Sequence, residues 1–241
     1  MPFSFPDIPR PAQCIAAFHP GAKTSDPIAV TDPRAILAFD CSGASCSAAV
    51  VIDNTVVASQ FVEMTRGQAE VLVPMIAAVM AAGGVDFAAL DAIATTVGPG
   101  SFTGLRIGLA TARGLALAAD RPVIAVTAFE AFRAASPAGA LTVLIDSRRG
   151  PLFVQAFDAA GRPEGEPLSL EPEAAAEFLA RRNGGHAGDG IPLVPGYRAA
   201  QAGRIRAESV AEAARRLDPS ARARPALPLY LRAPDVTLPK T

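Results

Sequence analysis

Residues 36–52 read ILAFDCSGASCSAAVVI, and residues 141–157 read LTVLIDSRRGPLFVQAF. Each stretch is an apolar run that ends in an aspartate, Asp40 or Asp146, and continues through a short turn into a second apolar run. Two apolar runs joined by a turn are the pattern of a β-hairpin. Because the same unit occurs twice, the sequence predicts two related halves.

Further elements are predicted where apolar residues recur with the period of a strand or a helix. Residues 69–82 carry apolar side chains at i, i+3, i+4 and i+7, which predicts a helix ended by a glycine pair. The patterns Thr127-x-x-Glu130 and Ser209-x-x-Glu212 each predict a capping box at a helix start. The other predicted elements are strands at 56–63, 91–97 and 123–126, a helix ending near 119, and a helix near 173–182.

Two halves that each begin with an aspartate-ended hairpin are typical of the actin-like ATPase superfamily, in which the two turns hold the phosphates of ATP. The sequence therefore predicts an α/β protein with an actin-like (ASKHA) fold. Its two related, ribonuclease-H-like lobes would be mixed sheets flanked by helices, formed by residues 35–136 and by residues 137–241 with a proline-rich tail. Residues 1–34 hold seven prolines and no periodic apolar pattern, so we expect them to be a loose extension.

The two aspartates allow two interpretations. As metal–nucleotide ligands, Asp40 and Asp146 would face each other across a cleft; as structural residues, they would hydrogen-bond their own turns. The second turn, SRRGP, places Arg148 and Arg149 where a phosphate loop needs small residues, and Pro151 removes a backbone donor. We favour the structural role and an eroded nucleotide site, although the two arginines could bind phosphate by charge.

A glycine-rich segment, GPGSFTGLR at residues 98–106, joins a predicted strand to a predicted helix. Its glycines permit positive φ or close backbone approach, and Ser101 and Thr103 could cap the helix, a geometry that could also cradle an anion. The segment fits neither a P-loop, nor a dinucleotide-binding loop, nor a nucleophile elbow. Gly104, Gly108 and Thr111 form a smooth stripe, for internal packing or for a partner.

Composition limits the function further. No apolar run approaches the roughly 18 residues of a membrane span, and the start lacks a signal peptide, so we expect a cytoplasmic protein. With a net charge of −1, the chain cannot hold RNA by bulk electrostatics. Cys14, Cys41 and Cys46 are expected to be core thiols. The two histidines, His19 and His186, are too few and too far apart for a metal site.

These segments resemble the TsaB (YeaZ) family. The resemblance rests on the opening hairpin, on QAEVLVPMI, DSRRGPLFVQAF, the GDG at 188–190 and PLYLRAP, and above all on the motif residues Gly98, Pro99, Gly100, Ser101, Phe102, Thr103, Gly104, Leu105 and Arg106. Departures from the family pattern are Gln68, Cys41 and Ser147. The family implies a role in making N6-threonylcarbamoyladenosine beside the tRNA anticodon, with a catalytic partner, TsaD, and an ATPase, TsaE.

The resemblance implies a non-catalytic scaffold that activates TsaD, with tRNA reached only through the complex. No catalytic, cofactor-binding or metal residue is then expected on the isolated chain, because ATP and metal belong to the partners. Helices 69–82 and 102–118 would pair with TsaD, or with a second copy when TsaD is absent. On the first of them, Val71, Met75 and Met80 are expected to lie beside the buried stripe. The predicted interface consists of Val71, Leu72, Met75, Ile76, Val79, Gly104, Gly108 and Thr111.

Two alternatives remain open from the sequence. An actin-like ATP-dependent enzyme, such as a small-molecule kinase or a peptidase, would bind ATP and Mg²⁺ as a lone chain. A free-standing RNA-binding module would bind tRNA without a partner and lose it in salt. The sequence does not decide between monomer and homodimer, or which surface meets tRNA.

Overall fold

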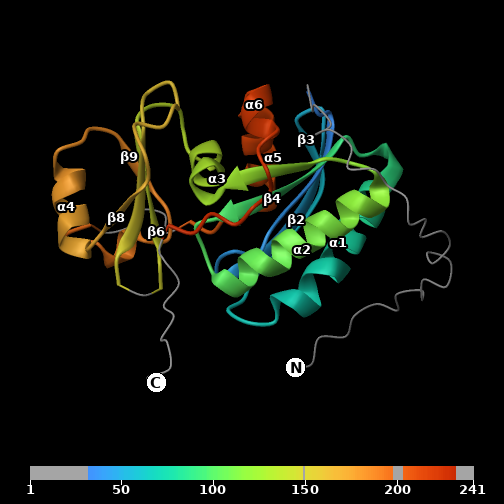
Figure 1. Cartoon of the computed structure of the whole chain (residues 1–241), viewed down its shortest axis with the longest axis horizontal. Coiled ribbons are helices and arrows are strands. Elements are labelled where there is room, and N and C mark those ends of the chain that lie inside the picture. Colours follow the sequence, from blue (N-terminus) through green and yellow to red (C-terminus); the bar gives the residue numbers. More distant parts are fainter. Residues whose placement is uncertain (1–31, 149, 198–202, 232–241) are drawn as a thin grey trace, which may run out of the picture.

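The computed structural model describes residues 32–148, 150–197 and 203–231. Five layers follow one another across the molecule in Figure 1: the helices α1 and α2, a first sheet, the helices α3 and α5, a second sheet, and the helix α4. No helix in the described ranges is long and apolar enough to cross a membrane. The predicted extension 1–34 lies outside the described residues except for its last three.

The first sheet has five strands in the order β3-β2-β1-β4-β5. β1, β2 and β3 form the predicted antiparallel meander, and β4 and β5 add to it in parallel. Both faces of β1, β2 and β4 are buried, which explains their continuous apolar runs. The strands are β1 (Ala35–Asp40), β2 (Ser45–Ile52), β3 (Thr55–Glu63), β4 (Ala92–Gly98) and β5 (Val123–Thr127).

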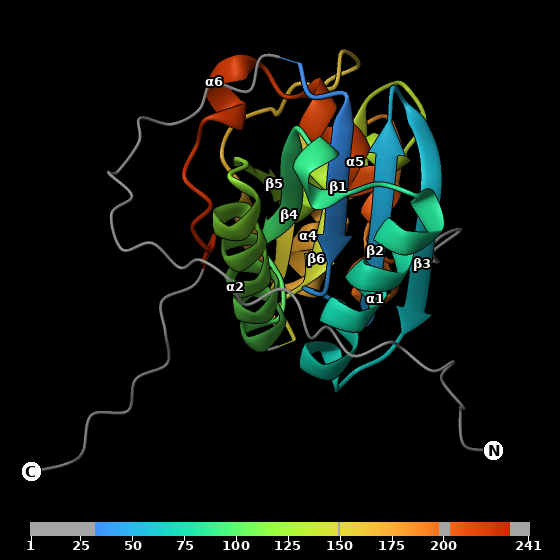
Figure 2. The same cartoon turned by 90° about the vertical axis from the view of Figure 1, so that its right-hand side faces the viewer.

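Two helices, α1 (Gln68–Gly83) and α2 (Phe102–Ala119), lie side by side on one face of this sheet, as Figure 2 shows. α1 ends at Gly84, which adopts the left-handed conformation of a helix cap. Ser101 caps α2, because its side chain accepts a hydrogen bond from the backbone N–H of Gly104. A short 3-10 turn, η1 (Phe87–Ala89), connects α1 to β4.

The second sheet has the same strand arrangement as four of the five strands of the first sheet. Its order is β8-β7-β6-β9, with an antiparallel meander and one parallel strand, as in β3-β2-β1-β4. The predicted duplication, and with it the predicted fold class, is therefore confirmed. The elements are β6 (Leu141–Asp146), β7 (Leu152–Phe157), β8 (Leu168–Leu170), α4 (Pro172–Ala180), β9 (Gly185–Ala187) and the 3-10 turn η2 (Ile191–Leu193).

The middle layer consists of α3 (Ala128–Ala135) and α5 (Ala207–Arg216), with the short α6 (Pro219–Arg222) after them. The capping box of Thr127 and Glu130 is present in full and confirms that prediction. The second predicted capping box, Ser209-x-x-Glu212, is wrong. Ser209 lies inside the first turn of α5 and donates its hydroxyl to the carbonyl of Arg206, 2.7 Å away, which is the backbone-directed bond that competes with a capping role.

The end of the chain returns to the first sheet. Ile205 and Val210 belong to the same buried cluster as Ile36 and Ile124, so α5 covers the face of the first sheet opposite α1 and α2. The segment 224–230 then passes the C-terminal end of β4, where the backbone N–H of Leu229 donates to the carbonyl of Val97 at 2.7 Å. The strands of the first sheet thus come from residues 35–127 and those of the second from residues 141–187, whereas α5 and Leu229 return to the first sheet. The division into two lobes at residue 137 stays a prediction.

Candidate functional site

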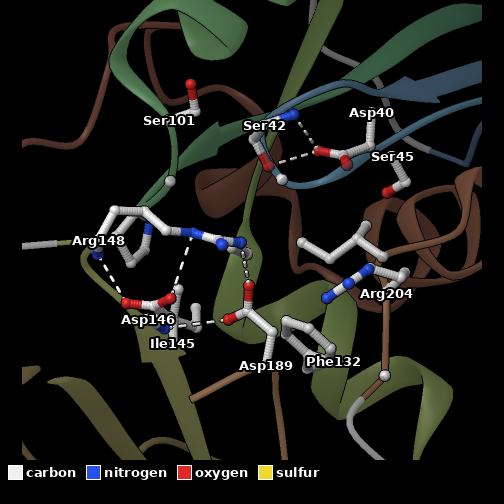
Figure 3. Close-up of a pocket in the computed structure, with 16 residues that line it drawn as sticks. Asp40, Ser42, Ser45, Ser101, Phe132, Ile145, Asp146, Arg148, Asp189 and Arg204 are labelled. Atoms are coloured by element: carbon white, nitrogen blue, oxygen red, sulfur yellow. Dashed lines mark hydrogen bonds and ion pairs between the residues drawn. The ribbon is translucent and has the colours of Figure 1, made fainter. Parts of the chain in front are cut away.

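The ends of the two aspartate-ended strands meet at one cleft between the lobes. Asp40 at the end of β1 and Asp146 at the end of β6 line the same cavity, together with Asp189 of the GDG loop and Arg148 (Figure 3). The cavity measures about 20 Å³. The favoured structural interpretation expected both aspartates to hydrogen-bond their own turns, and the contacts below show these bonds. Their position on one cavity is also what the metal–nucleotide interpretation expected.

Asp40 is a fully buried carboxyl group. Its Oδ1 accepts hydrogen bonds from the backbone N–H of Ser42 at 3.2 Å, from the hydroxyl of Ser42 at 2.6 Å, and from the hydroxyl of Thr96. Its Oδ2 has no hydrogen-bond partner among the described residues. Burial raises the pKa of Asp40, and the charge of Asp189 raises it further against the effect of these donors. Asp40 therefore fixes the first turn and the end of β4.

Arg148 occupies the other side of the cleft. Its backbone N–H donates to Asp146 at 2.7 Å, and its guanidinium lies 3.3 Å from the second oxygen of Asp146 and 3.1 Å from Asp189. Asp189 in turn accepts the backbone N–H of Asp146 at 3.0 Å. Burial raises the pKa of Asp189, while the Asp146 N–H and the Arg148 charge oppose that shift. Arg148 holds a left-handed φ of 64°, which is uncommon for residues other than glycine.

This arrangement does not fit the metal–ATP complex that the actin-like fold suggests. The guanidinium of Arg148 already pairs with two of the three carboxylates, and a cavity of about 20 Å³ holds little more than one water. Across the described part of the chain, no three His, Cys, Asp or Glu side chains are placed to hold a metal ion. Arg149, the second arginine of the predicted obstruction, lies outside the described residues.

The glycine-rich motif joins the first hairpin to α2 by close backbone contact. A Cβ atom at Gly104 would lie 2.0 Å from the carbonyl oxygen of Cys41, and one at Gly100 would lie 2.7 Å from that of Ser42. The backbone N–H of Ser101 donates to the carbonyl of Ser42 at 2.7 Å. Because the backbone of Gly100, Ser101 and Gly104 is in close contact with the first turn, the motif acts in packing. The predicted cap at Thr103 is not formed; Thr103 lies within the first turn of α2.

Most of the predicted interface residues are buried inside the chain. The exposed fractions are 0% for Leu72, 6% for Met75, 2% for Ile76, 1% for Val79 and 4% for Met80. Gly104 and Gly108 are buried against Cys41 and Thr95, while Val71 and Thr111 are half-buried. The expectation that Met75 and Met80 lie beside the buried stripe is wrong, because α1 packs against both the sheet and α2 and thus buries a wider arc of its surface.

The surface that α1 and α2 leave exposed is also apolar, but it consists of a few large side chains among many small ones. Val73 is 53% exposed, Phe102 is 51% exposed and Leu117 is 72% exposed. The other exposed positions on the two helices are small or weakly polar, and the exposed charged ones are Glu70, Arg106 and Arg113. We call this surface the outer face; its further members are Ala69, Pro74, Ala77, Ala81, Ala82, Thr103, Ala110, Gly114 and Ala118. Sequence reasoning missed it by following the largest side chains, although Ala69, Val73, Ala77 and Ala81 recur at i, i+4.

The remaining candidate groups are poor catalysts. Cys41 and Cys46 are buried, and burial raises the pKa of the Cys46 thiol to about 12 and that of Cys41 further, so neither is a ready nucleophile. His186, in β9, lies edge-on to Tyr197, and burial lowers its pKa. His19 and Cys14 lie outside the described residues.

The sequence matches two kinds of known protein. Residues 57–165 match the sequence model of the TsaD family, tRNA N6-adenosine threonylcarbamoyltransferase. The transferase of Novosphingobium aromaticivorans is 43% identical over 110 residues, which cover 41% of this chain and 31% of that protein. This chain thus spans about a third of that transferase. The Escherichia coli tRNA threonylcarbamoyladenosine biosynthesis protein TsaB is 34% identical over 157 residues, which cover 62% of this chain and 68% of TsaB.

Solved structures agree with the second match. A crystal structure from Pseudomonas aeruginosa, described as similar to the peptidase YeaZ, superposes with a TM-score of 0.69 at 29% identity and covers 82% of this chain and 99% of its own. A second structure, YeaZ from the same organism, gives a TM-score of 0.66 at 26% identity, with the same coverage of both chains. The E. coli match spans more than two thirds of TsaB, and both YeaZ structures are matched almost whole. The chain therefore belongs to the TsaB (YeaZ) family.

Proposed function

We propose that this chain is a scaffold subunit that binds and activates a TsaD-like catalytic subunit. That partner would transfer the threonylcarbamoyl group to N6 of the adenosine next to the anticodon in tRNA. The observation that carries the proposal is the outer face of α1 and α2, which joins half-exposed Val73 and Phe102 to a row of alanines with few charges. An exposed apolar surface of this kind on a water-soluble domain marks a partner site.

The shape of the outer face suits another helix pair. Ala69, Ala77 and Ala81 are small, so a partner helix could approach α1 closely and bury Val73 between the backbones. The core of such an interface is depleted in charge, whereas its rim is polar. Glu70 near the start of α1 would then lie at the rim. The guanidinium of Arg106 lies 3.7 Å from the centre of the Phe102 ring, so a partner that contacts Phe102 would also meet this charge.

The nature of the partner follows from the family matches. The segment that matches the TsaD family, residues 57–165, contains both α1 and α2. A TsaD-like protein therefore carries counterparts of the same two helices and could present a similar face. Two related faces can pair about a pseudo-twofold axis, as identical faces do in a symmetric dimer. The same geometry supports a homodimer of this chain when the partner is missing.

The chemistry is assigned to the partners. Since Arg148 already pairs with Asp146 and Asp189, we propose that ATP and the metal bind to TsaD-like and TsaE-like subunits in the cytoplasm, and that tRNA binds only to the assembled complex. The alternative of an independent actin-like ATPase requires ATP and Mg²⁺ to bind the lone chain. Titration calorimetry with Mg–ATP separates the two, because the scaffold gives no saturable heat at millimolar nucleotide.

The docking proposal is tested by co-purification of this chain with the TsaD homologue of the same organism. Val73→Asp places a charge in the middle of the outer face and should weaken the complex at least about thirtyfold, because an unpaired charge would be buried. The monomer should keep its stability within about 0.5 kcal/mol, because the side chain is exposed. Leu193→Asp is the matched control: Leu193 is 46% exposed and lies on η2 in the other lobe. Equal binding by both variants would disprove docking on α1 and α2.

A further inference from the structure

A second hollow lies on the side of the molecule away from the outer face. It measures about 490 Å³, is open to solvent, and is lined by α3, the loop between β7 and β8, and the end of α5. In Figure 1 that loop rises beside α3. A volume of this size is in the range of small-ligand pockets, roughly 300–1,000 Å³. Neither the cleft between the hairpins nor the proposed docking uses this hollow.

The lining of the hollow combines an apolar floor with basic side chains. Phe157 of β7, Leu217 after α5 and Leu229 of the C-terminal segment supply apolar surface. Arg133, Arg162 and Arg216 also line it. A ligand in the hollow would thus contact both apolar side chains and guanidinium groups.

The three arginines differ in their partners. Arg162 pairs with Asp158 at 2.9 Å, and Arg216 pairs with Glu212 at 2.8 Å. Within the described ranges, Arg133 has no carboxylate partner. Its guanidinium donates to the carbonyl of Pro137 at 2.8 Å, and its buried Nε has no hydrogen-bond partner there.

The carboxylates around Arg133 do not supply its missing partner. Glu130, one helical turn earlier in α3, forms an ion pair with Arg224 and takes part in the capping box with Thr127. Glu166 lines the hollow from an exposed position on the loop and pairs with no arginine among the described residues.

The backbone around Arg133 leaves space for its guanidinium. A Cβ atom at Gly161 would lie 3.3 Å from the Nε of Arg133, and Gly161 holds a left-handed φ of 82°. The glycine therefore lets the loop pack against the guanidinium without a side chain between them. A half-buried cation with unused donors gains most from an anion that it can hydrogen-bond.

We infer that this hollow binds a small amphiphilic anion, with its apolar body on the floor and a single carboxylate, sulfonate or phosphate against Arg133. The apolar floor favours a ligand with a hydrocarbon body, and the guanidinium of Arg133 favours a ligand with an anionic group. The inference does not depend on docking to a TsaD-like partner, because the outer face lies on the opposite side of the first sheet.

The probe for this site is 8-anilinonaphthalene-1-sulfonate, and its control is N-phenyl-1-naphthylamine, which has the same rings without the sulfonate. The wild-type chain should bind the sulfonate saturably, with enhanced fluorescence. Arg133→Gln should weaken the sulfonate about tenfold, as expected for the loss of a charge-assisted hydrogen bond, and leave the neutral probe unchanged. Arg162→Gln is the matched control and should bind both probes as the wild type does, because Arg162 is paired and 79% exposed.

Two further variants keep the result unambiguous. Val73→Asp must bind the sulfonate normally, because a loss there would mean that the probe binds the outer face. Arg133→Lys should restore part of the affinity if charge at this position attracts the probe. The inference is overturned if the wild type shows no saturable binding, if Arg133→Gln binds like the wild type, or if Arg162→Gln or Val73→Asp weakens the probe as much as Arg133→Gln does.

Discussion

Three glycines on one helix give a graded prediction about the role of the motif. Gly104, Gly108 and Gly114 all lie in α2, yet their surroundings differ. A Cβ at Gly104 would lie 2.0 Å from a backbone oxygen of Cys41, and one at Gly108 would lie 3.3 Å from the hydroxyl of Thr95. A Cβ at Gly114 would have no atom of the described residues within 4 Å. If the motif acts through close packing, alanine substitutions should follow this order.

The magnitudes follow from two opposing effects. Replacing glycine by alanine inside a helix stabilises it by about 0.5–1 kcal/mol, and Gly114→Ala should gain that amount in full. In Gly108→Ala the gain is offset by crowding, so the change should be about zero. In Gly104→Ala the new methyl group collides with fixed backbone at the end of β1, and we expect a loss of about 3 kcal/mol, at the upper end of overpacking costs.

Urea unfolding followed by circular dichroism measures all three variants under one condition. Gly114→Ala should also raise the melting temperature by about 2 °C for a chain of this size. The reasoning would be refuted by a Gly104→Ala variant that is as stable as Gly114→Ala, because the packing between α2 and Cys41 would then not be tight. Unchanged co-purification of Gly114→Ala with the partner would in addition place the docking contacts elsewhere on the outer face.

Arg148→Ala should lower the unfolding free energy by about 1 kcal/mol more than Arg148→Gly, because glycine keeps the left-handed φ of 64° without strain; chemical unfolding of both variants checks this difference. Asp40→Asn should be more stable than the wild type at pH 8, because burial raises the folded-state pKa of Asp40 above its unfolded value. The stability that comes from protonating Asp40 is present at low pH and is lost as the pH rises through the folded-state pKa. The unfolding free energies of the two proteins should therefore converge towards pH 4. Parallel curves of unfolding free energy against pH from 4 to 8 would contradict this. Glu130→Gln should cost about 1–2 kcal/mol by breaking its pair with Arg224 while keeping the helix cap, as thermal unfolding can measure.

The sequence predicted the parts of the fold that local patterns encode. The two hairpins, the capping box of Thr127 and the helix after the glycine-rich loop depend on neighbours in the chain, and all of them are present. The return of α5 to the first sheet was not predictable in this way, because its apolar face does not say which sheet it covers. The contacts of Ile205 and Val210 are set by the whole chain.

The site was predicted less well, for a related reason. Periodicity identifies which side of a helix is apolar, but α1 is apolar on nearly every side, so its buried arc depends on α2. The large residues Met75 and Met80 were therefore placed at its side, whereas the exposed positions are Val73 and small alanines. Arg148 was expected to obstruct a phosphate loop by its bulk. Its ion pair with Asp189 was not predictable from local sequence, because Asp189 lies 41 residues further along the chain.

The proposed docking is tested most directly by amide hydrogen exchange of this chain with and without its TsaD homologue. Exchange should slow on binding in peptides from residues 68–83 and 102–119, and stay unchanged in β6, β7 and α4. Protection confined to the second lobe, or no protection at partner concentrations that saturate binding, would contradict docking through α1 and α2.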